Sequence, residues 1–155
     1  MHPVVHVRLG VPADVAVVAR QFHELWPDGS LAEHAEDAAA ILAGQPPSTT
    51  PLVVFVAETE GEVVGFVEAG LRSHADGCDP RRPVGFVEGW YVEEGHRRHG
   101  VGRALLQAAE DWARSQGCRE LASDTWADNE PSQRVHEALG FEVVDRCVHY
   151  RKPLG

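Results

Sequence analysis

The sequence EGHRRHGVGRALL, residues 94–106, places arginines and histidines between glycines, directly before an apolar helical pattern. A glycine-containing turn that follows a strand and opens a helix leaves several backbone N–H groups free, and these groups bind phosphate oxygens together with the helix dipole. Arg97, Arg98 and Arg103 add positive charge at this turn. Three interpretations compete: a nucleotide site, a nucleic-acid backbone site, or a basic turn surrounded only by water.

Two common nucleotide motifs do not fit this turn. Gly95 to Gly100 matches the GxxxxG of a P-loop, but Val101 and Gly102 follow where that motif needs Lys and then Ser or Thr. A dinucleotide fingerprint fails as well, because its third glycine position holds Leu105. The formal net charge of −10 argues against nucleic acid as the main partner and suits a cationic substrate.

Two carboxylates lie inside strand-like sequences. Glu88 interrupts the apolar run VGFVEGWYV, and Asp124 interrupts LASDTW. An acid in a buried strand costs free energy unless it has a partner or a catalytic task. Because a strand alternates its faces, an exposed position on the polar side of an edge strand explains each acid equally well.

The 155 residues suit a single domain spanning residues 1–155. The sequence shows neither a signal-peptide pattern nor an apolar run of the roughly 18 residues that span a bilayer, so we expect a cytoplasmic protein that does not bind membranes. The three cysteines show no CxxC spacing and are expected to be reduced thiols. The nine histidines are scattered without a zinc-ligand spacing, so no metal is expected.

Hydrophobic periodicity and turn residues predict a mixed α/β sheet layered with helices. Strands are expected at 4–9, 52–72 (a hairpin turning at Thr59-Glu60-Gly61), 84–92, 119–126 and 141–152. Helices are expected after Pro12, over 30–42 with Ser30 as N-cap, over 102–116, and over 130–139.

The six residues 97–102, RRHGVG, resemble the (Arg/Gln)-x-x-Gly-x-(Gly/Ala) motif of the GNAT acyltransferases. The preceding EGWYV and the later DNEPSQRVHEALGF lie where that family places its donor strand and its final helix. The resemblance covers essentially the whole chain and implies the GNAT fold, a mostly antiparallel central sheet with a splayed parallel strand pair and helices on both faces. GCD before VEG, GCRELASDT and VHEALGFEVVDRCVHYRK further resemble one branch, the aminoglycoside 6′-N-acetyltransferases.

The resemblance assigns the basic turn to the pyrophosphate of acetyl-coenzyme A. The backbone N–H of Val92 is implied as the oxyanion donor, at a bulge in the fourth strand near Tyr91, and Asn129 is implied as a contact of the pantetheine arm. His136 stands where many members of the family have a tyrosine, so it is a candidate acid for the leaving thiolate or, alternatively, a packed helix histidine. The implied cofactor-binding residues are Tyr91, Val92, Arg97, Arg98, His99, Gly100, Val101, Gly102, Arg103, Asn129 and His136.

The acceptor side is implied by the same resemblance. Trp26 matches an aromatic wall, Glu88 and Asp145 match carboxylate contacts, and Asp124 matches the proposed general base. The loop RSHADGCD, residues 72–79, departs from this branch because it lacks the expected aromatic residue.

The sequence therefore predicts acetyl transfer from acetyl-CoA to the 6′-amine of aminoglycosides. Two alternatives stay open: a GNAT enzyme for another amine (a polyamine, an amino sugar or a protein N-terminus), and a non-catalytic coenzyme A-binding module. A homodimer is expected, because the family commonly dimerises and the β-branched last strand could pair across chains.

Overall fold

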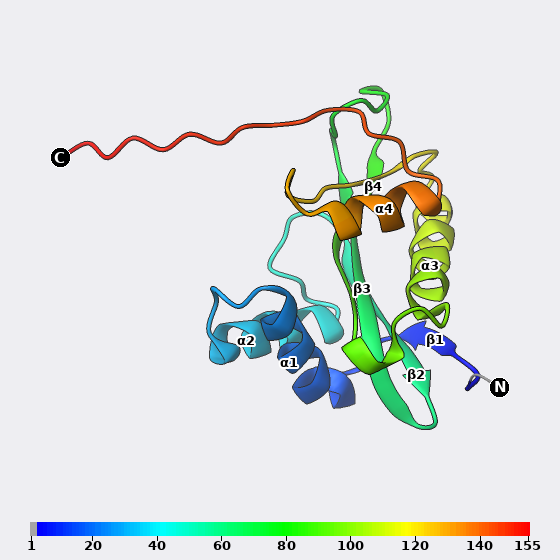
Figure 1. Ribbon diagram of the computed structural model, residues 1–155. Coiled ribbons are helices and arrows are strands. Elements are labelled where there is room, and N and C mark those ends of the chain that lie inside the picture. Colours follow the sequence, from blue (N-terminus) through cyan, green and yellow to red (C-terminus); the bar gives the residue numbers. More distant parts are fainter. Residues whose placement is uncertain (1–2) are drawn as a thin grey trace.

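The computed structural model describes residues 3–155, and within them a single sheet carries five strands in chain order (Figure 1). The strands are β1 His6–Leu9, β2 Leu52–Thr59, β3 Glu62–Arg72, β4 Val84–Val92 and β5 Leu121–Ser123. The first four strands pair antiparallel, whereas β4 and β5 run parallel. The predicted mixed α/β class, with one parallel strand pair, is confirmed.

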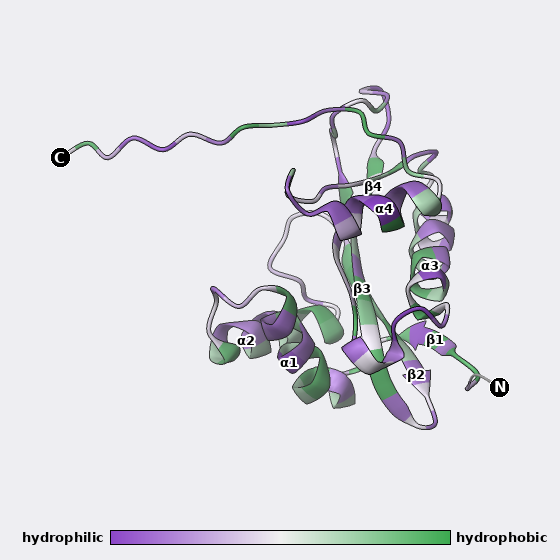
Figure 2. Cartoon of the chain, viewed as in Figure 1, coloured by the Kyte–Doolittle hydropathy of each residue, from purple (hydrophilic) through white to green (hydrophobic). Residues whose placement is uncertain are grey.

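Helices cover both faces of this sheet (Figures 1 and 2). They are α1 Val15–Leu25, preceded by the 3-10 turn η1 Pro12–Asp14, α2 Leu31–Leu42, α3 Val101–Ser115 and α4 Glu130–Ala138. Phe66 on β3 is buried with residues of α1 and α2, whereas its neighbour Val67 is buried with residues of α3. Because successive strand residues face opposite sides, the sheet has one core beneath α1–α2 and another beneath α3.

Two local predictions are confirmed in detail. The hairpin turn consists of Glu60 and Gly61, with φ angles of +51° and +80°, which are the left-handed values that a two-residue hairpin favours. Ser30 caps α2, since its hydroxyl accepts a hydrogen bond from the Glu33 N–H at 3.1 Å.

Strand β4 carries one residue more than its partner. Glu68 on β3 pairs with Gly89 and the next residue, Ala69, pairs with Val87, so Glu88 is the extra residue of a β-bulge. The parallel pairing between β4 and β5 ends at Val87, directly before this bulge. The bulge therefore lies at the point where the two parallel strands begin to diverge, earlier on β4 than the Tyr91–Val92 position that the sequence suggested.

The predicted strands after α3 are shorter than expected. Residues 119–126 contribute only the three-residue β5, and residues 141–155 form an extended segment without ladder partners in the described part of the chain. A strand is held by hydrogen bonds to a neighbour, and this segment only passes Gly77 and Trp126 before it leaves the body (Figure 1). The prediction of a final strand over 141–152 is thus wrong for the single chain.

An ion cluster fastens β1 to the start of α1. Arg8 donates two hydrogen bonds to Asp14, at 2.7 and 2.9 Å, and two to Glu58 on β2, at 2.6 and 3.0 Å. Asp14 is buried and also accepts a hydrogen bond from the Val11 N–H. Hydrogen bonding from Arg8 lowers the pKa of Asp14, so the folded state favours its ionised form.

We expect Asp14→Asn to lower the free energy of unfolding by about 1–3 kcal/mol at pH 7, the usual range for a charge-assisted hydrogen bond. A carboxyl whose pKa is depressed by folding stabilises the protein above its unfolded pKa and loses that contribution as the pH falls. The difference between the two proteins should therefore shrink below about pH 4, as measured by urea unfolding. Asp111→Asn is the control, because its ion pair with Arg114 is exposed, and an equal loss in both variants would contradict the assignment.

Candidate functional site

A cleft of about 370 Å³ opens between the end of α1 and strands β3 and β4. Trp26 and Glu88, two of the predicted acceptor residues, both line it. Gly89 makes this arrangement possible, because a Cβ there would lie 2.5 Å from the ring of Trp26. The remaining lining residues are Ser48, Thr50, Pro51, Leu52, Glu68, Gly70, Leu71 and Arg72.

Trp26 is held in place as an aromatic wall. Phe22 contacts its indole edge-on, with ring centroids 5.3 Å apart, and Phe66 packs beside it at 6.2 Å. His34 stacks on the indole, and its Nε2 lies 2.8 Å from the backbone oxygen of Trp26, so the ring donates a hydrogen bond there. Because these neighbours fix the indole, a ligand can pack against it at little cost in conformational entropy.

Glu88 already has a cationic partner in the structure. Arg72 donates two hydrogen bonds of 2.8 Å to its carboxylate, and the Arg72 guanidinium in turn lies 3.5 Å from the ring centre of Phe86. Gly70 brings β3 close to this carboxylate, since a Cβ at that position would stand 3.8 Å from Glu88 Cγ. The sequence singled out Glu88 but missed Arg72, whose role depends on the register between β3 and β4.

A second acid, Glu68, lines the same cleft from β3. Only 8% of the residue is exposed, and no hydrogen bond or ion pair to its carboxyl is found within residues 3–155. Burial, with smaller contributions from the charges of Glu88 and Asp37, raises its pKa to about 7. Sequence analysis overlooked Glu68, although it interrupts the apolar run VVGFVEAGLR just as Glu88 interrupts its own strand.

The other two predicted acceptor acids lie outside this lining. Asp124 is exposed and directly follows β5, whose last residue Ser123 pairs with Val87. It therefore lies where β4 and β5 begin to diverge. Asp145 lies on the extended C-terminal segment, where its carboxylate accepts a hydrogen bond from the Arg146 N–H, and the single chain does not bring it to the cleft.

His136 joins α4 to the ends of both parallel strands. Its Nδ1 lies 2.7 Å from the Ser132 carbonyl oxygen and must donate to it, which leaves Nε2 of the neutral ring to accept from the Ser123 hydroxyl at 2.8 Å. Trp90 on β4 packs edge-on against the imidazole, at 5.4 Å between ring centres. These contacts suit a packed helix histidine as well as a proton donor, and its role as an acid stays a prediction.

Asn129 serves as the N-cap of α4. Its side-chain oxygen accepts a hydrogen bond of 3.2 Å from the Ser132 N–H. The side-chain amide N–H groups have no such task in the cap, so the predicted contact with a pantetheine arm would use those donors.

The basic turn has the geometry of an anion site. Arg98 and Gly100 have φ angles of +67° and +82°, and the first hydrogen bond of α3 runs from the Ala104 N–H to the Gly100 oxygen. The N–H groups of residues 101–103 therefore point out of the helix end. A left-handed residue such as Arg98 is strained unless its surroundings hold it, and such strain is concentrated at functional sites.

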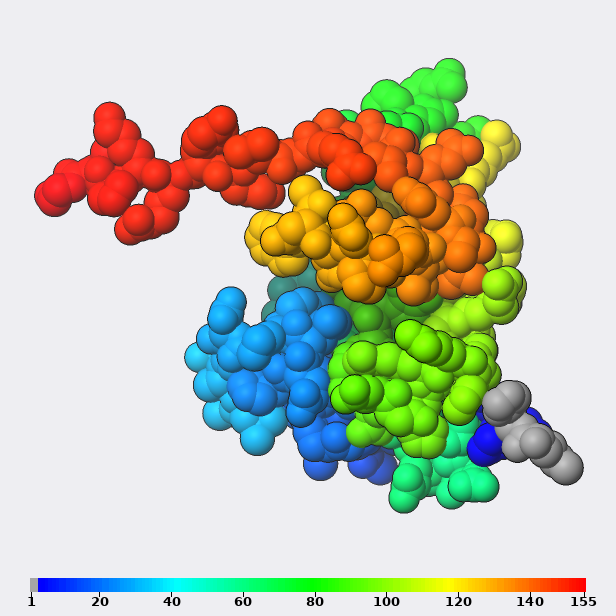
Figure 3. All heavy atoms as spheres, viewed as in Figure 1, coloured from blue at the N-terminus to red at the C-terminus, as the bar shows by residue number. Residues whose placement is uncertain are grey.

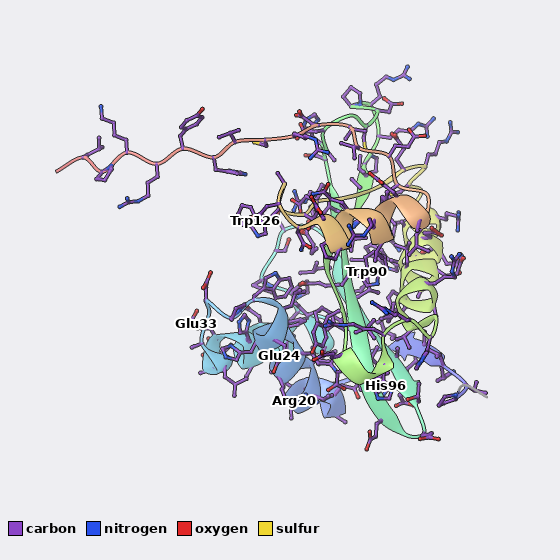
Figure 4. All side chains as sticks on the ribbon, in the orientation of Figure 1. Arg20, Glu24, Glu33, Trp90, His96 and Trp126 are labelled. Atoms are coloured by element: carbon purple, nitrogen blue, oxygen red, sulfur yellow. The ribbon has the colours of Figure 1, made fainter. Side chains whose placement is uncertain are left out.

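Side chains from β4, from α1 and from the turn itself hold this turn in place. Arg97 donates to the Val92 oxygen at 2.8 Å, and the Trp90 indole N–H donates to the Gly102 oxygen at 3.1 Å. Arg20 on α1 forms an ion pair of 3.0 Å with Glu93. Figure 4 shows Trp90 beneath α4, and Arg20 on the side of α1 next to the turn that carries His96.

The turn, α1–α2 and α4 surround a hollow on one face of the molecule (Figure 3). Strand β4 links the two sites, because Glu88 lines the acidic cleft and Val92 leads into the basic turn. Among residues 3–155 no three His, Cys, Asp or Glu side chains are arranged to hold a metal ion. No helix in the same range is long and apolar enough to cross a membrane.

Comparisons with known proteins agree with this geometry. Residues 16–141 match the model of the acetyltransferase (GNAT) family. The aminoglycoside N(6′)-acetyltransferase type 1 of Klebsiella aerogenes is 45% identical over 131 residues, which cover 84% of this chain and 85% of the relative. The enzyme of the same name from Stenotrophomonas maltophilia is 40% identical and covers 96% and 93%.

Solved structures show the same likeness. The aminoglycoside N-acetyltransferase AAC(6′)-Iy in complex with CoA has a TM-score of 0.87 and 35% identity, over 98% of this chain and 97% of that one. The same protein with the bisubstrate analogue CoA-S-monomethyl-acetylneamine has a TM-score of 0.86, over 97% and 99%. The chain therefore belongs to the GNAT acetyltransferase family and is similar within it to the aminoglycoside N(6′)-acetyltransferases.

Proposed function

We propose that this protein transfers the acetyl group of acetyl-CoA to the 6′-amine of aminoglycosides. The observation that carries the proposal is the position of an acidic, aromatic-walled cleft and an anion-binding turn along one bulged strand, β4. Aminoglycosides are polycations at neutral pH, and an acidic cleft attracts such ligands. The names of the relatives and the bound bisubstrate analogue support the same substrate.

The turn residues fit the pyrophosphate of acetyl-CoA. The N–H groups of residues 101–103 and the N-terminal end of the 15-residue α3 favour phosphate oxygens, and Arg98 and Arg103 add charge. Bound there, the coenzyme supplies an activated acetyl thioester. The Val92 N–H would orient the thioester oxygen, and Asn129 would hold the pantetheine arm.

The acceptor would bind with a sugar ring against Trp26 and an ammonium near Glu88. Asp124 would accept the proton that the ammonium must lose before its nitrogen can act as a nucleophile. His136, once protonated at Nε2 to an imidazolium, would donate that proton to the leaving thiolate of coenzyme A; in the neutral ring the same nitrogen accepts from the Ser123 hydroxyl. We also propose a cytoplasmic location, because acetyl-CoA is an intracellular metabolite.

An acceptor screen with release of free thiol as the signal tests the activity. We expect turnover of kanamycin- or tobramycin-like amines, and we expect Asp124→Asn to lower kcat by about 100-fold or more while acetyl-CoA still binds. Turnover of peptides or polyamines with none of aminoglycosides would overturn the substrate. Binding of CoA without turnover of any amine would indicate a non-catalytic module, and unchanged kcat in the variant would remove Asp124 as the base.

Two glycines at opposite ends of α3 give a matched test of the turn. Gly100 and Gly117 have φ angles of +82° and +84°, and a Cβ at either position would meet no atom within 4 Å. Alanine at either position should therefore cost a similar amount of stability, about 1 kcal/mol. Only Gly100→Ala should also weaken acetyl-CoA binding, by about tenfold in titration calorimetry, because it disturbs the amides that face the phosphates. Equal affinity in the two variants would argue against this site.

We propose further that the protein is a homodimer in which the C-terminal segments pair across chains. Residues 141–155 are extended, and Val143, Val144, Val148 and Tyr150 are exposed. Such a segment, with unpaired backbone groups, is a template for pairing with another chain. Helix α4 supports the proposal as well, because none of its residues is buried in the single chain.

Sedimentation equilibrium tests the dimer. We expect a dimer of the 16.9 kDa chain, and we expect Val148→Asp to raise the dissociation constant at least about tenfold by placing a charge in the paired segment. Val4→Asp is the control, since Val4 is exposed at the other end of the chain. A monomeric wild-type protein, or an equal effect of both substitutions, would refute pairing through the C-terminal segment.

A further inference from the structure

Glu68 is a buried acid for which residues 3–155 provide no hydrogen-bond or ion-pair partner. It shares the α1–α2 face of β3 with Phe66, because strand residues two apart face the same side. Glu88 faces the same side, as its closeness to Gly70 shows, because Gly70 lies two residues from Glu68 on β3. Two carboxyl groups from adjacent strands thus line one small cleft.

Arg72, the cationic side chain that lines the cleft, pairs with only one of these two acids. Both hydrogen bonds of Arg72 reach Glu88, and no cationic side chain in the described residues pairs with Glu68. The remaining charges near Glu68 are negative: Glu88 on β4 and Asp37 on α2. A carboxyl that served stability alone would be expected to have a hydrogen-bond donor, since burying an unpaired polar group costs free energy.

The rest of the surroundings are apolar or neutral. Trp26 and Leu52 line the cleft beside Glu68, and Ser48 and Thr50 supply hydroxyl groups at its edge. Burial raises the pKa of Glu68 to about 7, so near neutral pH the carboxyl is divided between its neutral and ionised forms. The site therefore changes its charge easily when a cation enters.

We propose that Glu68 is a specificity-determining residue that binds an ammonium group of the acceptor, next to the one bound at Glu88, and releases its proton as the cation enters. This inference rests on the proposed function and adds a second cation subsite to it. The ammonium supplies the partner that Arg72 does not provide, and its charge stabilises the carboxylate in the low-dielectric cleft. Acceptors with two nearby amines should gain from both subsites, whereas a monoamine engages only one.

The linkage between proton binding at Glu68 and acceptor binding gives the direction in which the affinity for the acceptor changes with pH. The free protein binds a proton at Glu68 below about pH 7, and the complex does not, so acceptor binding releases a proton and tightens as the pH rises from 6 to 8. At pH 7 this group contributes about half a proton per acceptor bound, because it is then about half protonated. The charged groups that act on Glu68, namely Glu88 and Asp37, and the Arg72 partner of Glu88 remain in place in a Glu68 variant, so the comparison isolates one carboxyl.

The test is Glu68→Gln, which keeps the shape and removes the titration. Tobramycin is the probe, titrated calorimetrically at pH 7 in two buffers that differ in ionisation enthalpy, which gives the number of protons released. We expect about half a proton less than in the wild type, a KM for tobramycin raised about tenfold, and a kcat changed less than about threefold. Glu68→Asp should restore part of the proton release, and Glu62→Gln, an exposed change at the start of the same strand, should match the wild type.

The outcomes separate this inference from the proposed function. If the wild type acetylates tobramycin while Glu68→Gln leaves the proton count and KM unchanged, the Glu68 subsite is wrong and the proposed function stands. If tobramycin is not acetylated but spermidine is, the proposed function fails, and the same titration with spermidine supports or overturns the subsite. If the wild type binds neither tobramycin nor spermidine, both the proposed function and the Glu68 subsite fail.

Circular dichroism checks that the variant folds. Glu68→Gln should melt at a higher temperature than the wild type at pH 8, because the wild-type carboxyl is then ionised and buried.

Discussion

The extra residue in β4 is the constraint on which both sites depend. The pairing of β4 with β5 ends at Val87, directly before the bulge at Glu88, and β4 continues toward the basic turn without a strand partner on that side among residues 3–155. Because the bulge inserts one residue, it reverses the faces of the residues that follow it: Gly89 instead of Trp90 lies on the α1–α2 face, and Trp90 packs against His136 of α4. One inserted residue therefore coincides with the end of the parallel pairing and leaves Gly89, with no side chain, beneath the ring of Trp26.

The cleft combines rigid walls with an incomplete charge balance. Aromatic neighbours hold the Trp26 ring in place, and Gly89 leaves room for it. Ligand binding therefore costs little conformational entropy at this side chain. Arg72 balances Glu88 but not Glu68, and the folded protein carries the cost of that unpaired acid. Such local departures from optimal stability are typical of functional sites, where the missing partner is the ligand.

The sequence predicted features that depend on neighbouring residues along the chain. The glycine turn before α3, the cap at Ser30 and the hairpin at Glu60-Gly61 depend on local backbone preferences, and each lies where it was expected. Arg72 and Glu68 were missed because their meaning depends on strand register, and a shift of one residue reverses the face of every side chain. The resemblance pointed to Glu88, but the bulge at this residue has no signal that a single sequence makes visible.

The C-terminal segment shows a different limit of sequence reasoning. Its β-branched residues correctly indicate an extended conformation, yet a strand also needs a partner, and residue composition does not say which molecule supplies it. Under the proposed pairing, mass action decides how much of the protein has a complete sheet. The expression level of the gene would then set the fraction of chains that are paired as well as their number, because at low concentration the C-terminal segment beside α4 would lack its strand partner.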